Sequence, residues 1–276
     1  MTTYTETAYA KINLALHVCR RRDDGYHDIE TLFAFLDAGD TLTATATANV
    51  TFSISGPFGD DLLNAEDNLV LRTARLMQDH FQTGGGAQLT LQKNLPVASG
   101  IGGGSADAAA AARLLCKVWK LDATDADLAN LLAPLGSDIP ACVSSTTVFG
   151  NGTGTTLVSI DGSDLSGLPA LLVNPRKPVY TGAVFAAWDG VDRGALGAKS
   201  PLTEALRGRN DLEAPAIDIC PEVGDVLDAL RKTGPIFSRM SGSGATCFAL
   251  YESVETRHIA QSSMNPSWWS LAGQLR

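Results

Sequence analysis

The sequence predicts a fold that mixes strands and helices, as one large domain or two ordinary ones. Segments that alternate apolar and polar residues, as at 88–92, stand between segments with apolar residues at helical spacing, as at 70–81. The 276 residues are enough to bury a sizeable core. The polar, glycine-containing stretch 159–168 is typical of a domain boundary, so we expect domains at 1–160 and 161–276.

The first half of the chain is expected to open with strands joined by a polar loop. Alternation of apolar and polar residues predicts strand structure at 8–18, 29–36, 41–54 and 88–92. The polar loop at 20–27 contains Asp24 and Gly25, a pair that favours a turn.

A helix is expected before the strand at 88–92. Val70, Ala74, Met77 and Phe81 recur at helical spacing, and Asp67 is a good N-cap for the helix that they form. The glycines at 84–86 then indicate a C-cap and a turn.

The second half is expected to alternate short helices and strands. Helices are predicted at 108–119, 125–132, 221–231 and 255–262. Strands are predicted at 170–173, 236–240 and 246–251, with a hairpin from 146–149 and 156–160 around Asn151 and Gly152. The apolar face of the helix at 221–231 consists of Val223, Val226, Leu227 and Leu230.

The composition restricts the class of protein and its partners. The formal net charge of −9 argues against a broad nucleic-acid or anionic-membrane surface, so an anionic substrate must be held by local groups. No apolar run approaches the length of a membrane span, and the polar N-terminus lacks the regions of a signal peptide. Five cysteines without Cys-x-x-Cys spacing indicate free thiols in a reducing cytoplasm, and the histidines show no metal-ligand spacing.

The most informative stretch is a glycine-rich loop at 96–107, which opens the predicted helix at 108–119. The run Gly102, Gly103, Gly104 needs an explanation, because each glycine costs backbone entropy. Backbone N–H groups and the helix dipole make such a loop a good phosphate site. A flexible hinge or tight turn is the alternative, but the loop coincides with a helix start, which favours phosphate.

Neither common phosphate-loop pattern fits this stretch. A P-loop ends in Gly-Lys-Ser/Thr, and no lysine follows these glycines. The dinucleotide pattern can begin at Gly100 and Gly102, but Ser105 stands where the third glycine belongs. When the pattern begins at Gly102 and Gly104, Asp107 stands there instead.

Three further patterns have two readings each. Lys11 lies within an apolar strand, where an ammonium is costly unless it is paired or reaches a site; the alternative is a snorkelling surface lysine. Asp138 lies among apolar and small residues, and the alternative is a helix cap or turn aspartate. The run 239–246, Arg-Met-Ser-Gly-Ser-Gly-Ala-Thr, is a second glycine-rich turn that by itself indicates only a hairpin.

Taken together, these segments resemble the galactokinase, homoserine kinase, mevalonate kinase and phosphomevalonate kinase superfamily along nearly the whole chain. The glycine loop is close to its pattern Pro-x-x-x-Gly-x-Gly-Gly-Gly-Ser-x-Asp-Ala. The Asp-Gly-Tyr-His element at 24–27 resembles one branch, the kinases of the non-mevalonate isoprenoid pathway that act on a cytidine diphosphate-linked methylerythritol. Further segments resemble the same branch: 10–14, 31–33, 67–69, 136–140, 210–213 and 240–244.

The resemblance implies a two-domain α+β kinase, with a ribosomal-protein-like N-terminal half and a ferredoxin-like C-terminal half. It implies ATP with Mg²⁺, with Asp138 accepting the proton of the substrate hydroxyl and Lys11 holding Asp138 ionised. Ser105 would reach Mg²⁺, and no second metal carboxylate is evident. The implied nucleotide-binding residues are Asn68, Lys93, Pro96, Val97, Ala98, Ser99, Gly100, Ile101, Gly102, Gly103, Gly104, Ser105 and Ala106.

The resemblance also implies a small-molecule partner, phosphorylated on its 2-hydroxyl. Tyr26 would stack on the cytosine, His27 would hydrogen-bond the base edge, and Asn13 would contact the erythritol end. Thr181 and Phe185 lie where the family closes the cytidine pocket; their alternative is an ordinary helix N-terminus and a core aromatic.

Two other functions are weighed against this expectation. The first is another kinase of the superfamily, of the homoserine or mevalonate type, which the Asp-Gly-Tyr-His element disfavours. The second is a non-catalytic binding or regulatory protein on the same fold, which the presence of both Lys11 and Asp138 disfavours.

Overall fold

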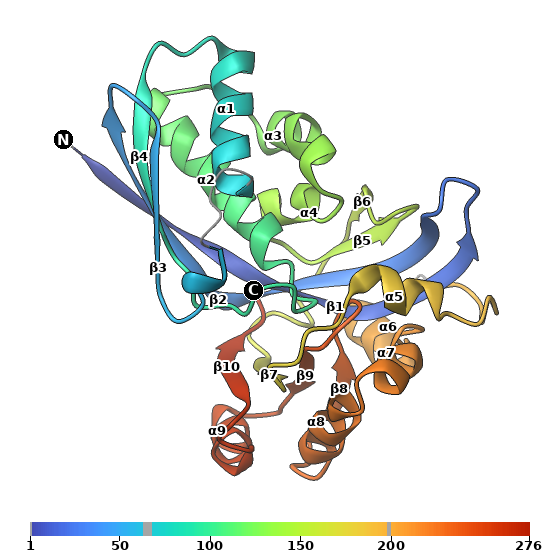
Figure 1. Ribbon diagram of the computed structural model, residues 1–276. Helices are drawn as coiled ribbons and strands as arrows, with labels where there is room; N and C mark the ends of the chain where they lie inside the picture. Colours follow the sequence, from blue (N-terminus) through green and yellow to red (C-terminus); the bar gives the residue numbers. More distant parts are fainter. Residues whose placement is uncertain (1, 63–67, 198–199) are drawn as a thin grey trace. The chain divides into compact units, whose positions relative to one another are not determined.

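The structure is a computed structural model that describes residues 2–62, 68–197 and 200–276 (Figure 1). These residues form two compact units. The first unit takes residues up to Ala10, Gly39–Val97 and Gly102–Ser145, and the second takes Lys11–Ala38, Ala98–Ile101 and Thr146–Arg276. Strands β1 (Thr3–Arg21) and β2 (His27–Thr47) contribute residues to both units. The boundary at residue 160 stays a prediction.

In the first unit, helices α1 and α2 pack against each other, and α2 contacts β4 (Figure 1). Strand β4 (Gly86–Gln92) pairs antiparallel with the end of β2 and parallel with β3 (Thr51–Ser55). The helical elements of this unit are η1 (Asp60–Leu62), α1 (Leu69–Phe81), α2 (Gly103–Trp119), α3 (Asp125–Leu132), η3 (Ala133–Leu135) and α4 (Ile139–Ser144).

Helix α1 forms where the helical spacing predicts it, but both of its ends differ from the prediction. Asn68 caps its start, because Asn68 Oδ1 accepts a hydrogen bond from the Val70 backbone N–H at 2.8 Å. Asp67, the predicted cap, lies outside the described residues. At the other end, Gln82 adopts the left-handed conformation with φ 51°. The predicted glycine C-cap is therefore wrong, and Gly86 begins β4 instead.

Helix α2 is buried along its alanine run. The five alanines at 108–112 are all fully buried, and their small side chains allow α1 and α4 to pack closely against the helix. The prediction missed α4. Pro140 stands in its first turn, where a proline without an N–H group is tolerated.

The second unit contains a hairpin and a separate antiparallel sheet. Strand β5 (Val148–Asn151) pairs with β6 (Thr156–Ser159), which confirms the predicted hairpin, and with Thr31–Phe33 of β2. The separate sheet has the order β10-β7-β9-β8. Its strands are β7 (Pro169–Asn174), β8 (Phe237–Met240), β9 (Cys247–Leu250) and β10 (Trp269–Gln274).

Five described helices belong to the second unit. They are α5 (Thr181–Ala186), α6 (Pro201–Arg207), α7 (Glu213–Ile219), α8 (Glu222–Arg231) and α9 (Val254–Ser263). Helix α8 buries Val223, Val226, Leu227 and Leu230, the four residues of its predicted apolar face. The prediction missed α5, α6, α7 and β10, which are short and lack a clear apolar period.

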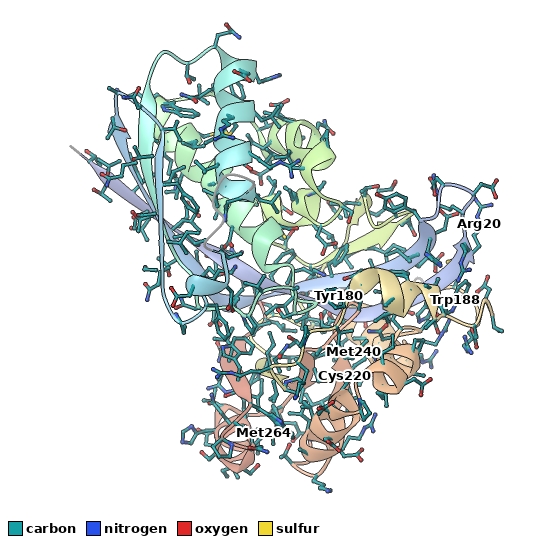
Figure 2. All side chains as sticks on the ribbon, viewed as in Figure 1. Arg20, Tyr180, Trp188, Cys220, Met240 and Met264 are labelled. Atoms are coloured by element: carbon teal, nitrogen blue, oxygen red, sulfur yellow. The ribbon has the colours of Figure 1, made fainter. Side chains whose placement is uncertain are left out.

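The core of the second unit gathers side chains from both of its β regions and from its helices. Trp188, Cys220 and Met240, labelled in Figure 2, are buried members of this core, and Met264 packs against it. The end of the chain also joins this unit. Leu275 forms a β-bridge with Leu36, and the Arg276 N–H donates to the Phe35 carbonyl at 3.0 Å.

Candidate active site

The first part of the candidate site is the start of α2 in the first unit. Gly102 is the N-cap residue, with φ 63°, and no side chain caps this end of the helix among the described residues. The first turn contains no acidic residue. The first N–H groups of a helix lack partners within the helix, and the dipole adds positive charge there. The predicted residues Gly102–Ala106 therefore form an end that fits a phosphate group.

The segment of Asp138 lies beside this helix start. Asp138 occupies the N-cap position of α4 and makes no side-chain capping bond, so the helix-cap alternative does not account for its side chain. A Cβ on Gly136 would lie 3.9 Å from Ser105 Oγ, and α4 packs against α2. The first unit thus brings the predicted catalytic segment next to the predicted phosphate helix.

The middle of the glycine loop, 98–101, belongs to the second unit, where it is held by backbone contacts. The Thr246 N–H donates to the Ser99 carbonyl at 3.1 Å, and Ser241 Oγ donates to the Gly100 carbonyl at 2.9 Å. Gly100 has φ 79°, and a Cβ there would lie 2.8 Å from the Gly244 carbonyl oxygen. The second glycine-rich run is therefore both a hairpin turn, between β8 and β9, and the support of the first loop.

Lys11 is buried in the second unit and belongs to a polar network. Its exposed fraction is 3 %, so the snorkelling alternative is wrong. Lys11 Nζ donates to Asn13 Oδ1 at 2.9 Å and lies 5.2 Å from the centre of the Phe33 ring. Asn13 Nδ2 donates to Thr31 Oγ1 at 2.7 Å, and Thr31 Oγ1 donates to the Ala15 carbonyl. This chain of bonds fixes the position of the lysine charge. Its pairing with Asp138 stays a prediction.

The second unit also brings together aromatic residues that are far apart in the sequence. The His27 ring lies 5.0 Å from the Phe185 ring and 5.7 Å from the Trp188 ring, between centroids. Tyr26, next to His27, leaves 65 % of its surface exposed. An exposed aromatic beside a buried cluster of rings suits stacking of a planar base.

The surroundings of His27 favour its neutral form. Burial lowers its pKa, and the Arg21 charge lowers it further. Arg21 Nε donates to His27 Nε2 at 3.3 Å, so Nδ1 carries the ring proton and is the nitrogen that can donate to a ligand. The prediction missed Arg21 and Trp188, because neither lies in a recognisable motif.

Thr181 and Ser243 connect helix α5 to the second glycine-rich turn, with 2.9 Å between their hydroxyl oxygens. Thr181 is the first residue of α5, and Tyr180 before it exposes 77 % of its surface (Figure 2). Thr181 therefore lies at a helix N-terminus, as its alternative interpretation held, and also contacts the turn that supports the glycine loop.

Asn68 and Lys93, the predicted adenine contacts, both bond to other groups of the first unit. Asn68 Oδ1 caps α1, as described above. Lys93 Nζ lies 2.5 Å from Asp40 Oδ2 and 2.6 Å from Asp107 Oδ2. Burial alone would lower the pKa of Lys93, but the two carboxylates outweigh it and raise the pKa. The Lys93 ammonium contacts both carboxylates. A contact between Lys93 and adenine stays a prediction.

The described part of the chain contains no metal site made only of protein side chains. No group of three His, Cys, Asp or Glu side chains there could hold a metal ion. Mg²⁺ in kinases keeps several waters and is bound largely through substrate phosphates, so a sparse set of protein ligands fits that metal.

No described helix is long and apolar enough to cross a membrane.

Known proteins resemble this chain along its whole length. Residues 68–146 match the family model described as GHMP kinases N terminal domain, and 193–269 match GHMP kinases C terminal. A relative from Novosphingobium aromaticivorans, named 4-diphosphocytidyl-2-C-methyl-D-erythritol kinase, is 55% identical over 98% of this chain and 92% of its own length. The relative of that name from Sphingopyxis alaskensis is 51% identical over 99% of both chains.

This chain belongs to the 4-diphosphocytidyl-2-C-methyl-D-erythritol kinase family.

A solved structure agrees with membership in this kinase family. The crystal structure described as 4-(cytidine 5'-diphospho)-2C-methyl-D-erythritol kinase matches with a TM-score of 0.85 and 31% identity, over 99% of each chain. The α+β GHMP kinase fold that the sequence predicts is confirmed. The roles of individual residues in this kinase family member stay predictions.

Proposed function

We propose that this chain transfers the terminal phosphoryl group of ATP to the 2-hydroxyl of 4-diphosphocytidyl-2-C-methyl-D-erythritol, in the non-mevalonate isoprenoid pathway. The observation that carries the proposal is the full-length likeness to relatives named for this reaction. The neutral, ring-packed His27 beside exposed Tyr26 supports the cytidine end of the substrate.

The proposed roles follow from the chemistry of each group. The 2-hydroxyl oxygen bonds to the terminal phosphorus of ATP, the bond from that phosphorus to the bridging oxygen breaks, and Asp138 takes the hydroxyl proton. Lys11 stabilises the negative charge of the transferred group. The start of α2 binds the phosphates, and Ser105 is the proposed protein ligand of Mg²⁺, whose other ligands would come from phosphates and water.

The remaining proposed residues contact the cytidyl substrate. Tyr26 stacks against the cytosine and His27 Nδ1 donates to the base, while Asn13 contacts the erythritol end. Thr181 and Phe185 close the cytidine pocket. We place the reaction in the cytoplasm, because all five cysteines are free thiols, as in a reducing compartment.

A substrate panel tests the proposal. ADP release from ATP is measured with the cytidyl substrate, homoserine and mevalonate in turn, with and without Mg²⁺. We expect turnover only with the cytidyl substrate and only with Mg²⁺. Turnover with homoserine or mevalonate instead would assign the chain to another kinase type, and no turnover with any substrate would favour a non-catalytic role.

A further inference from the structure

Three ionisable side chains in the first unit are buried together and take no part in the proposed transfer of the phosphoryl group. The side chains of Lys93, Asp40 and Asp107 expose 2 %, 0 % and 4 % of their surface. Charges removed from water in this way are costly unless each finds a close partner. The ammonium here bridges the two carboxyl groups, as described above. We call Lys93, Asp40 and Asp107 the buried ion cluster.

Asp40 holds the segment that enters the glycine loop. Its Oδ1 accepts hydrogen bonds from two consecutive backbone N–H groups, of Asn94 at 2.5 Å and of Leu95 at 2.8 Å. Its Oδ2 accepts from Lys93 Nζ. One carboxylate therefore fixes three consecutive residues that lead into Pro96, the first residue of the loop.

Asp107 attaches the other end of the loop to the same ammonium. Asp107 lies in the second turn of α2, the helix that begins at Gly103. A Cβ on Gly103 would lie 3.1 Å from Lys93 Nζ and 3.8 Å from Asp40 Oδ2. The buried ion cluster thus lies directly against the first residue of the phosphate helix and is bonded to both ends of the loop.

We propose that Asp40 is a positioning residue for ATP: through the buried ion cluster it fixes the two ends of the glycine loop at the spacing that phosphate binding requires. This inference rests on the proposed function only for the identity of the nucleotide. Asp40 does not touch the substrates; it acts through Lys93 and the backbone of residues 94 and 95. The other end of the loop, which Asp40 reaches through Lys93 and Asp107, carries the N–H groups at the start of α2, and these must be pre-positioned to bind phosphate tightly.

Replacing Asp40 by Asn separates the two functions of its carboxylate. The Asn side chain keeps an oxygen that can accept from the N–H groups of Asn94 and Leu95, but it turns an NH₂ group toward the Lys93 ammonium. Asp37→Asn is the matched control, because Asp37 lies on the same strand and accepts the Gln274 N–H at 2.8 Å, apart from the cluster. If Asp40→Asn does not fold, Asp40→Glu keeps the charge but displaces the carboxylate from the Asn94 and Leu95 N–H groups, leaves Lys93 and Asp107 in place, and keeps the test.

The experiment measures the Kd of a non-hydrolysable ATP analogue by titration calorimetry, and the KM of each substrate. For Asp40→Asn, or for Asp40→Glu, we expect about a tenfold to hundredfold weaker nucleotide binding, with the KM of the alcohol substrate within twofold of the parent. Asp37→Asn should match the parent in both. Parental nucleotide affinity in the Asp40 variants, or an equal rise in both KM values, would overturn the proposal.

The same measurements separate this proposal from the proposed function. A parent protein that binds the ATP analogue but does not phosphorylate the cytidyl substrate contradicts the proposed function, while the effect of Asp40 on nucleotide binding can still be measured. Active parent protein with unchanged nucleotide binding in the Asp40 variants contradicts only the role of Asp40.

Discussion

Asn13 accepts a hydrogen bond from the Lys11 ammonium at 2.9 Å, so the orientation of the Asn13 carboxamide determines where the lysine charge lies. Thr31 sets that orientation, because its hydroxyl already donates to the Ala15 carbonyl and can only accept from Asn13 Nδ2. A flipped carboxamide would turn its NH₂ group toward Lys11.

Thr31→Val is therefore expected to lower kcat about tenfold or more. The valine has nearly the same shape but leaves Asn13 Nδ2 and the Ala15 carbonyl without their buried partner, which costs about 1–3 kcal/mol per group. Thr31→Ser keeps the hydroxyl and is the matched control. Steady-state kinetics at saturating substrates measures both variants, and equal kcat values for Val and Ser would show that the hydroxyl is not needed.

Asp138→Asn is expected to reduce kcat by about 10²–10⁴, the usual value of a positioned base, while nucleotide binding stays near that of the parent. Lys11→Ala should cause a similar loss, and the double variant should lose little more, because two residues that act as one unit do not give additive effects. Single-turnover kinetics and calorimetry measure the two quantities. Near-parental kcat in Asp138→Asn would remove Asp138 from the reaction.

Tyr26→Ala is expected to raise the KM of the cytidyl substrate about tenfold to a hundredfold and to leave the KM of ATP nearly unchanged. Stacking of a base on an aromatic ring contributes about 1–3 kcal/mol. His27→Ala should in addition weaken discrimination between cytidine and uridine forms of the substrate. Kinetics with each substrate varied in turn measures this, and equal effects on both KM values would place Tyr26 outside the cytidine pocket.

His17 is expected to make the stability of the folded protein depend on pH. Burial lowers its pKa below the ordinary histidine value of 6.5, and the Arg209 charge lowers it further, against the opposing effects of the Gly194 carbonyl, Asp211 and Glu30. His17 Nε2 accepts a hydrogen bond from the backbone N–H of Arg209 at 3.3 Å, a bond that requires the neutral ring. The unfolded chain therefore binds the proton more readily, and the stability that His17 contributes is present above its unfolded pKa and lost as pH falls below it.

Urea unfolding between pH 7.5 and about 5 measures this effect. The free energy of unfolding should fall toward acid pH, and it should fall less in His17→Gln, whose amide can also donate and accept. His27 has a lowered pKa as well and adds a loss of the same sign in both proteins. The same slope in the parent and in His17→Gln would show that His17 does not contribute.

Sequence patterns predict the parts of the fold that depend on interactions between neighbouring residues. The apolar face of α8 is buried at its four predicted positions, because an amphipathic helix has only one face that can cover a core. The C-cap of α1 was mispredicted, because a left-handed cap at Gln82 is unusual for a residue with a side chain. The glycine at 86 is instead required by its neighbour in space, since a Cβ there would collide with the Asn49 backbone.

The candidate site also contains residues that the sequence can indicate and residues that it cannot. Lys11, Asp138 and the glycine loop are candidate residues from the sequence alone, because they stand in motifs whose chemistry is recognisable. Asp40 could not be proposed from the sequence, because a lone aspartate after a glycine resembles a turn residue, and its partner Lys93 lies 53 positions away. Thr31 was within a recognised segment, but its role depends on hydrogen bonds to another strand, which no local pattern encodes.

The bond between Arg276 and Phe35 has a consequence for how the chain folds as it is synthesised. The first unit needs no residue beyond Ser145, so all of its parts leave the ribosome while the rest of the chain is still being made. The second unit needs strand segments from positions 11–38, of which Leu36 pairs with Leu275 and Phe35 accepts a hydrogen bond from Arg276. These early strand residues must therefore wait until residues 275 and 276 have been made, a delay that favours slow folding and exposes apolar side chains to aggregation or to chaperones.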